Sequence, residues 1–118
     1  MTTLTPPEKV SAPQNYWTLD KVIYKHRPEG ADPMEFFDVA IGTWCGAPRL
    51  AIRWSCVPDR PLGHPSSSGH PTWFIIPELL APAVASQVRQ ILEGHLADTQ
   101  QSLDALSKWL TTATNEAR

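Results

Sequence analysis

Two arginines and a tryptophan on one face of a predicted strand pair are the side chains most able to do chemistry in this chain. Arg49 and Arg53 are four positions apart in a run with a period of two, so both point to the same side of one strand. Trp44 precedes the turn before that strand and shares this face. Guanidinium groups pair with phosphates and an indole stacks on bases, so the face predicts a groove for single-stranded nucleic acid.

The preceding run, residues 16–27, can add to this face if it pairs beside the same strands. Lys25 and Arg27 would then supply two more cations for phosphates. Tyr24 is a second candidate for base stacking, although its position alternates with that of Lys25 and indicates the opposite face. The alternative is an ordinary solvated sheet face with a packed Trp44, because such faces commonly carry Lys and Arg.

Metal and nucleophile chemistry have weaker support. The candidate metal ligands are Cys45, Cys56, His64 and His70, with 10, 7 and 5 residues between successive members, which matches no structural zinc pattern. No predicted base lies near either thiol, and the chain has neither a nucleophile-elbow motif nor a glycine-rich phosphate motif. We therefore expect no metal, no cofactor and no enzymatic activity.

Hydrophobic periodicity predicts the strands that position these residues. Alternation places one apolar set on a core face: Phe37, Val39, Ile41, Leu50, Ile52 and Trp54. The two strands form a hairpin that turns at residues 45–48, and residues 72–76 form a fourth strand after residues 16–27. Residues 57–71 are a Pro- and Gly-rich loop, and residues 1–15 are a predicted disordered tail.

A helix of about 30 residues, from about 78 to 112, is predicted to follow the strands, with a frayed end at residues 113–118. Its leucines follow a heptad seam that one small sheet cannot cover, so we expect a homodimer that packs through Leu92, Leu96, Leu103, Leu106 and Leu110. The alternative is two helices that break near Gly94 or Thr99 and fold back on one protomer.

Composition indicates a single domain, residues 16–112. The chain has 118 residues, of which 42% are hydrophobic, and its net charge is −2, so its overall charge does not favour nucleic acid. It has no apolar run long enough to span a membrane and no signal-peptide pattern. Both cysteines are predicted to be reduced, which indicates a cytoplasmic protein.

The order of three strands, a glycine-bearing loop, a fourth strand and an amphipathic helix resembles a known fold. It is similar to the single-stranded-DNA-binding fold of transcriptional positive cofactor four and its bacterial and phage relatives, over residues 36–96. The segments that carry the resemblance are Trp44-Cys45-Gly46-Ala47-Pro48, Arg49-Leu50-Ala51-Ile52-Arg53-Trp54, the Gly63 to Gly69 loop, the Trp73 to Ile76 strand and the leucine-rich helix. The resemblance implies a homodimer with curved sheets, in which Trp44, Arg49 and Arg53 bind nucleic acid.

The sequence thus predicts an α+β protein with a curved four-stranded antiparallel sheet, a long C-terminal amphipathic helix and a homodimer. The predicted function is single-stranded DNA or RNA binding in transcription, replication or repair. The alternative is a protein–protein interaction module, a small regulator or inhibitor of a host complex that uses the C-terminal helix and the Pro-rich loop. The acidic balance of the chain favours this alternative.

Overall fold

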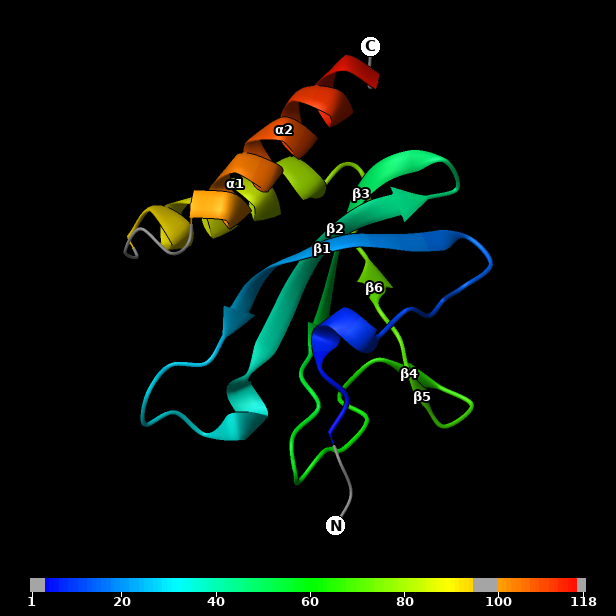
Figure 1. Ribbon diagram of the computed structural model, residues 1–118, viewed down its shortest axis with the longest axis vertical. Coiled ribbons are helices and arrows are strands. Elements are labelled where there is room, and N and C mark those ends of the chain that lie inside the picture. The colour runs from blue at the N-terminus through cyan, green and yellow to red at the C-terminus, as the bar shows by residue number, and fades with distance from the viewer. Residues whose placement is uncertain (1–3, 95–99, 117–118) are drawn as a thin grey trace.

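A four-stranded antiparallel sheet forms the centre of the protein (Figure 1). The computed structural model describes residues 4–94 and 100–116. The strand order is β1-β2-β3-β6, with bounds Trp17–His26, Phe37–Trp44, Ala47–Trp54 and Phe74–Ile75. Cys45 and Gly46 join β2 to β3 with φ angles of 51° and 83°, as a tight hairpin turn requires. The predicted α+β class and the four-stranded antiparallel sheet are confirmed.

The long loop after β3 contains a second, small hairpin. β4 (Ser66–Ser67) pairs with β5 (His70–Pro71) through a turn at Ser68 and Gly69, both of which have positive φ angles. The loop after β3 is therefore organised around the turn of this small hairpin.

Two short 3₁₀ helices lie before β1 and before β2: η1 (Pro7–Lys9) and η2 (Pro33–Glu35).

Two separate helices follow the sheet, so the prediction of one long C-terminal helix is wrong. α1 spans Ala81–Glu93 and ends at Gly94, and α2 spans Gln100–Glu116. Glycine is a poor helix former, and Gly94 ends α1 where the apolar pattern alone predicted continuity. The helices lie next to each other on one side of the sheet (Figure 1), and both contact β3.

Three of the five leucines of the predicted dimer seam lie in or against the core of a single protomer. Leu92 and Leu106 are buried, and Leu110 packs against the same cluster as Ile41 and Leu50 of the sheet. The alternative of two helices folded back on one protomer describes this arrangement, and the described residues do not support the homodimer. Leu96 lies outside the described residues, as does the side chain of Leu103.

The N-terminal segment, residues 4–16, crosses the other face of the sheet instead of forming a disordered tail. Val10 is fully buried in a second cluster with Trp17, Ala40, Ala51 and Trp73. The Trp73 indole donates a hydrogen bond to the Val10 carbonyl (2.6 Å), and the Trp73 amide donates to the Ala12 carbonyl (2.9 Å). Burial of Val10 and these hydrogen bonds explain why a Pro- and Thr-rich segment is ordered.

An ion pair between Glu8 and Lys25 (2.6 Å) ties this segment to β1. Burial raises the pKa of the Glu8 carboxyl, but the hydrogen bond and charge of Lys25 outweigh it, so this pKa lies below its ordinary value of 4.5. Because the folded-state pKa is depressed, the pair stabilises the protein above the unfolded-state pKa, and this contribution is lost as pH falls through the folded-state pKa.

We therefore expect Glu8→Gln to lower the thermal unfolding midpoint at pH 7. The difference from the wild-type midpoint should shrink as the pH falls from about 5 to about 3, where the wild-type carboxyl also loses its charge. Thermal unfolding followed by tryptophan fluorescence across this range checks the prediction. A difference that stays constant with pH would contradict it.

Neither helix in the described part of the chain is long and apolar enough to cross a membrane.

Candidate nucleic-acid interface

The sheet face that the sequence predicted to bind nucleic acid is covered. Asp38, Ala40, Ala51, Arg53 and Ser55 do share one face, as alternation predicted, but all five are buried. The N-terminal segment, Trp73 and the loop of residues 57–71 pack over it. The expectation of an open groove on this face is therefore wrong, because periodicity assigns residues to a face without showing what covers it.

Arg53 is 2% exposed and holds the long loop to the sheet. Its guanidinium donates hydrogen bonds to the carbonyls of Leu62 and Thr72, one near each end of the loop, and to Cys56 Sγ at 3.7 Å. Burial lowers the pKa of Arg53, while nearby Cys56 and Asp38 raise it. Gly63 has a φ of 61°, and a side chain there would collide with the guanidinium. Arg53 thus has a structural position and does not reach the surface.

The other predicted phosphate-binding cations are each paired with a carboxylate. Arg27 donates to the buried carboxylate of Asp38 (2.6 Å), which also accepts a hydrogen bond from Ser55 (2.9 Å). Arg49 lies 3.5 Å from Glu78 and donates to the Pro48 carbonyl (2.7 Å). These partners, and Glu8 for Lys25, neutralise charges that the prediction assigned to phosphates.

The two predicted stacking residues lie on opposite faces. Trp44 is half-buried in the second cluster, where Tyr16 packs edge-on against it at 5.6 Å between ring centroids. Tyr24 lies on the helix-covered face and shares a hydrogen bond with His26 Nδ1 (2.7 Å). Burial raises the pKa of Tyr24, which the charge of Arg27 partly offsets, so its hydroxyl stays protonated at neutral pH. The structure therefore does not bring the six predicted residues together.

A row of aromatic rings lies instead on the helix-covered face of the sheet. His26, Phe37, Trp54 and His64 are successive cross-strand partners, and we call these four residues the aromatic row. The rings of His26 and Phe37 stack with centroids 4.6 Å apart, and Phe37 meets Trp54 edge-on at 6.5 Å. Neighbouring strands are about 4.8 Å apart, so the row offers one ring on each of β1, β2 and β3, and His64 of the following loop continues it beside β3.

Part of this row is accessible to solvent. Trp54 is 40% exposed, and Phe74 of β6, which pairs with the neighbouring position Ile52, is 54% exposed. A groove of about 460 Å³ lies between these rings and α1, where Val84 and Ile91 line its other wall. Gln87 of α1, His64 and Arg53 are the polar residues that line the groove, and the Arg53 guanidinium is already bonded to backbone carbonyls. The groove can therefore hold flat apolar groups and offers few hydrogen bonds to them.

One guanidinium group, that of Arg60, lies on the aromatic row. Arg27 at the end of β1 lies over the ring of Phe36 at 5.2 Å instead and pairs with Asp38 of the opposite face. Arg60 lies over the indole of Trp54 at 5.3 Å and donates hydrogen bonds to the carbonyls of Met34 and Ser55. A single strand of nucleic acid presents both bases and phosphates, so a site that binds it needs stacking rings with cations beside them.

Sequence reasoning assigned Phe37 and Trp54 to the core and so missed the aromatic row. The core assignment holds for Val39 and Ile41, which are buried beneath the helices. It fails at the strand ends, where Trp54 remains exposed. A signal was present in the sequence, because three large aromatic residues, Phe36, Phe37 and Trp54, mark the same end of the hairpin.

The other candidate chemistry finds no assembled site in the described residues. Cys45 is exposed and Cys56 is half-buried, and both are free thiols. Within residues 4–94 and 100–116, no group of three His, Cys, Asp or Glu side chains is placed to hold a metal ion.

In comparisons with known proteins, no family model, no curated protein and no solved structure matches this sequence.

Proposed function

We propose that this protein binds single-stranded nucleic acid through the aromatic row, in transcription, replication or repair. The observation that carries the proposal is the in-register run of rings from β1 to the loop after β3, with Trp54 and Phe74 exposed. Bases of an unpaired strand stack on such rings whatever their sequence, whereas paired bases in a duplex cannot. The proposal keeps the expected function and moves the binding surface to the opposite face.

The scarcity of polar groups in the groove determines the kind of recognition. Direct readout of a base needs donors and acceptors placed against its edge. Beside its apolar walls, the groove offers Gln87, His64 and Arg53, whose guanidinium is already bonded to backbone carbonyls. We therefore propose binding with little sequence preference, without a covalent step and without a cofactor, in the cytoplasm, where both thiols stay reduced. The resemblance to the positive cofactor four fold is part of this proposal.

Fluorescence anisotropy with labelled single-stranded and duplex oligonucleotides of one length tests the proposal. We expect the single strand to bind more tightly and Trp54→Ala to weaken it about tenfold to a hundredfold, since one stacked base contributes about 1–3 kcal/mol. Tyr16→Ala is the matched control, because Tyr16 is an exposed ring outside the aromatic row. Equal loss in both variants, or no binding at low salt, would contradict the proposal.

The salt dependence of the same titration counts the phosphate contacts. With Arg60 as the cation beside the aromatic row, the slope of log affinity against log salt should be about −0.7, since each contact to a single strand contributes about −0.7. A much steeper slope would indicate a basic groove elsewhere on the protein.

A protein–protein interaction module is the second candidate. Its support is a pair of exposed apolar residues just before α1: Leu79 is 91% exposed and Leu80 is 55% exposed. Contiguous exposed apolar residues mark interaction surfaces. If oligonucleotides fail to bind the folded protein, this candidate gains support when Leu80→Glu, but not Trp54→Ala, abolishes concentration-dependent association measured by light scattering.

A further inference from the structure

The guanidinium of Arg53 is a buried charge that has a thiol, and no carboxylate, as its neighbour. Arg53 is 2% exposed, and among the residues that the structure describes no carboxylate lies within ion-pair distance of it. Its hydrogen bonds go to two backbone carbonyls and to Cys56 Sγ at 3.7 Å. A buried charge is costly unless an opposite charge lies beside it. Of the three acceptors, the thiol is the one that can ionise.

The charges around this contact are unbalanced. Arg27 and Asp38 form an ion pair at 2.6 Å, so their charges offset each other. Burial lowers the pKa of Arg53, the charges of Cys56 and Asp38 raise it, and the charge of Arg60 lowers it again. The hydrogen bonds of Arg60 also go to backbone carbonyls. The positive charges of Arg53 and Arg60 therefore favour a negative charge on the Cys56 sulfur.

Both of these arginines also have a buried donor without an acceptor. Arg53 Nε and Arg60 Nε are buried, and neither has a hydrogen-bond partner within the part of the chain that the structure describes. Buried donors without a partner are rare in folded proteins. An oxygen atom added to the Cys56 sulfur would bring a new acceptor to these donors.

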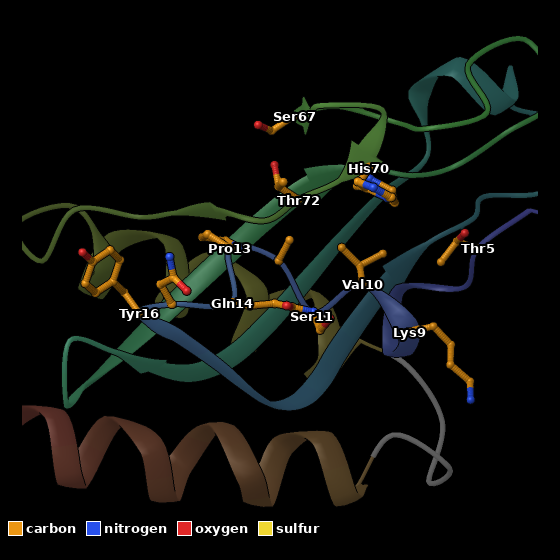
Figure 2. Close-up of a pocket in the computed structure, with 13 residues that line it drawn as sticks. Thr5, Lys9, Val10, Ser11, Pro13, Gln14, Tyr16, Ser67, His70 and Thr72 are labelled. Atoms are coloured by element: carbon orange, nitrogen blue, oxygen red, sulfur yellow. Dashed lines mark hydrogen bonds between the residues drawn. The ribbon is translucent and has the colours of Figure 1, made fainter.

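The contact between Arg53 and Cys56 lies where the long loop is fastened to the sheet. The carbonyls that Arg53 holds belong to Leu62 and Thr72, one near each end of the loop. Figure 2 shows Thr72 and Ser67 on one wall of the cavity between the β4–β5 hairpin and the N-terminal segment. A chemical change at the thiol therefore acts on the group that fixes the loop at both ends.

The two thiols of the chain differ in surroundings. Cys56 is half-buried, whereas Cys45 is exposed in the turn between β2 and β3. No side chain among the described residues donates a hydrogen bond to the sulfur of Cys45, unlike that of Cys56. If exposure alone decides reactivity, Cys45 is the more reactive thiol, and if the neighbouring cation decides it, Cys56 is.

We propose that Cys56 is a modification site that hydrogen peroxide oxidises to a sulfenic acid. The thiolate attacks one peroxide oxygen, so that an S–O bond forms as the O–O bond breaks. The sulfur loses two electrons, the peroxide gains them, and the hydroxide that leaves takes up the proton lost by the thiol and becomes water. The proposal rests on the contact between Arg53 and Cys56 and goes beyond nucleic-acid binding.

Treatment of the full native chain with hydrogen peroxide and dimedone, which traps sulfenic acids, tests this proposal. Both thiols are free in one molecule, so mass spectrometry of proteolytic fragments gives the labelling rate of each under identical conditions. We expect Cys56 to be labelled about tenfold faster than the more exposed Cys45, because a neighbouring cation favours the reactive thiolate. Equal rates, a faster Cys45, or no label on Cys56 would overturn the proposal.

The same measurement in urea separates the effect of the fold from that of the local sequence. Unfolding releases Cys56 from Arg53, so the two labelling rates should agree within about twofold. An unchanged advantage of Cys56 in urea would show that the contact with Arg53 is not its cause. In the native protein, Cys45→Ser should leave the labelling rate of Cys56 unchanged, whereas a lower rate would contradict a site that works with a single thiol.

Discussion

Replacing Arg53 by alanine should lower the thermal unfolding midpoint by about 10 °C or more. The substitution leaves the carbonyls of Leu62 and Thr72 without the donor that now satisfies them. Each unsatisfied buried group costs about 1–3 kcal/mol, and 1 kcal/mol moves the midpoint by about 4 °C in a domain of this size. Thermal unfolding followed by circular dichroism measures the effect.

Arg49→Ala is the matched control, because the sequence predicted equal roles for the two arginines. Arg49 is partly exposed and its ion pair with Glu78 is long, at 3.5 Å, so its loss should move the midpoint by only a few degrees. Equal small effects of the two substitutions, with Arg53→Ala also weakening single-strand binding selectively, would show that Arg53 reaches a ligand and that the face is open.

Leu106→Ala should destabilise the protein by about 3 kcal/mol. Leu106 of α2 is fully buried in the core between the helices and the sheet. Truncation of a buried leucine leaves a cavity that the surrounding side chains fill only in part. Chemical denaturation with urea, followed by tryptophan fluorescence, gives the change in the free energy of unfolding. The exposed Leu80 is the control, and Leu80→Ala should change this energy by well under 1 kcal/mol.

Protein concentration separates this explanation from a dimer seam. If Leu106 packs within one protomer, the loss of stability is the same at low and high protein concentration. If it packs between two copies, the unfolding midpoint of the wild-type protein rises with concentration and the variant loses that dependence. The second result would restore the homodimer that the heptad pattern predicted.

Local patterns predicted the hairpin correctly. Alternation over β2 and β3 placed Val39, Ile41 and Leu50 in the core, where the structure has them. The turn was predictable because Gly46 takes the positive φ that a two-residue hairpin needs. Period two and turn chemistry are properties of a few consecutive residues, which is why sequence alone suffices for them.

The faces of β1 were less predictable, because this strand contains two irregularities. Its register with β2 shifts between Leu19 and Lys21 and again between Val22 and Tyr24. As a result Ile23 and Tyr24, which strict alternation assigns to opposite faces, both contact the helix-side core. A bulge inserts one residue without a reliable sequence signal, so alternation fails beyond it.

Coverage of a face depends on contacts distant in sequence. The small residues Ala40 and Ala51 indicated a shallow face, and the structure fills that space with Val10, Trp17 and Trp73. The same limit hid the aromatic row, whose exposure at Trp54 depends on where the helices lie. The heptad pattern likewise predicted an apolar stripe and could not specify whether α1 and α2 meet within one chain or across two.

The five tryptophans of this chain allow the most direct test of where nucleic acid binds. Trp54 belongs to the aromatic row. Trp17 and Trp73 belong to the second cluster, and Trp44 packs against it. Trp109 of α2 is buried in the core between the helices and the sheet. The measurement is an NMR titration of the five indole N–H signals with a short oligothymidine. We predict that the Trp54 signal shifts with saturation while the other four stay in place. A shift of Trp44 with an unchanged Trp54 would contradict the proposed surface and return the site to the opposite face of the sheet.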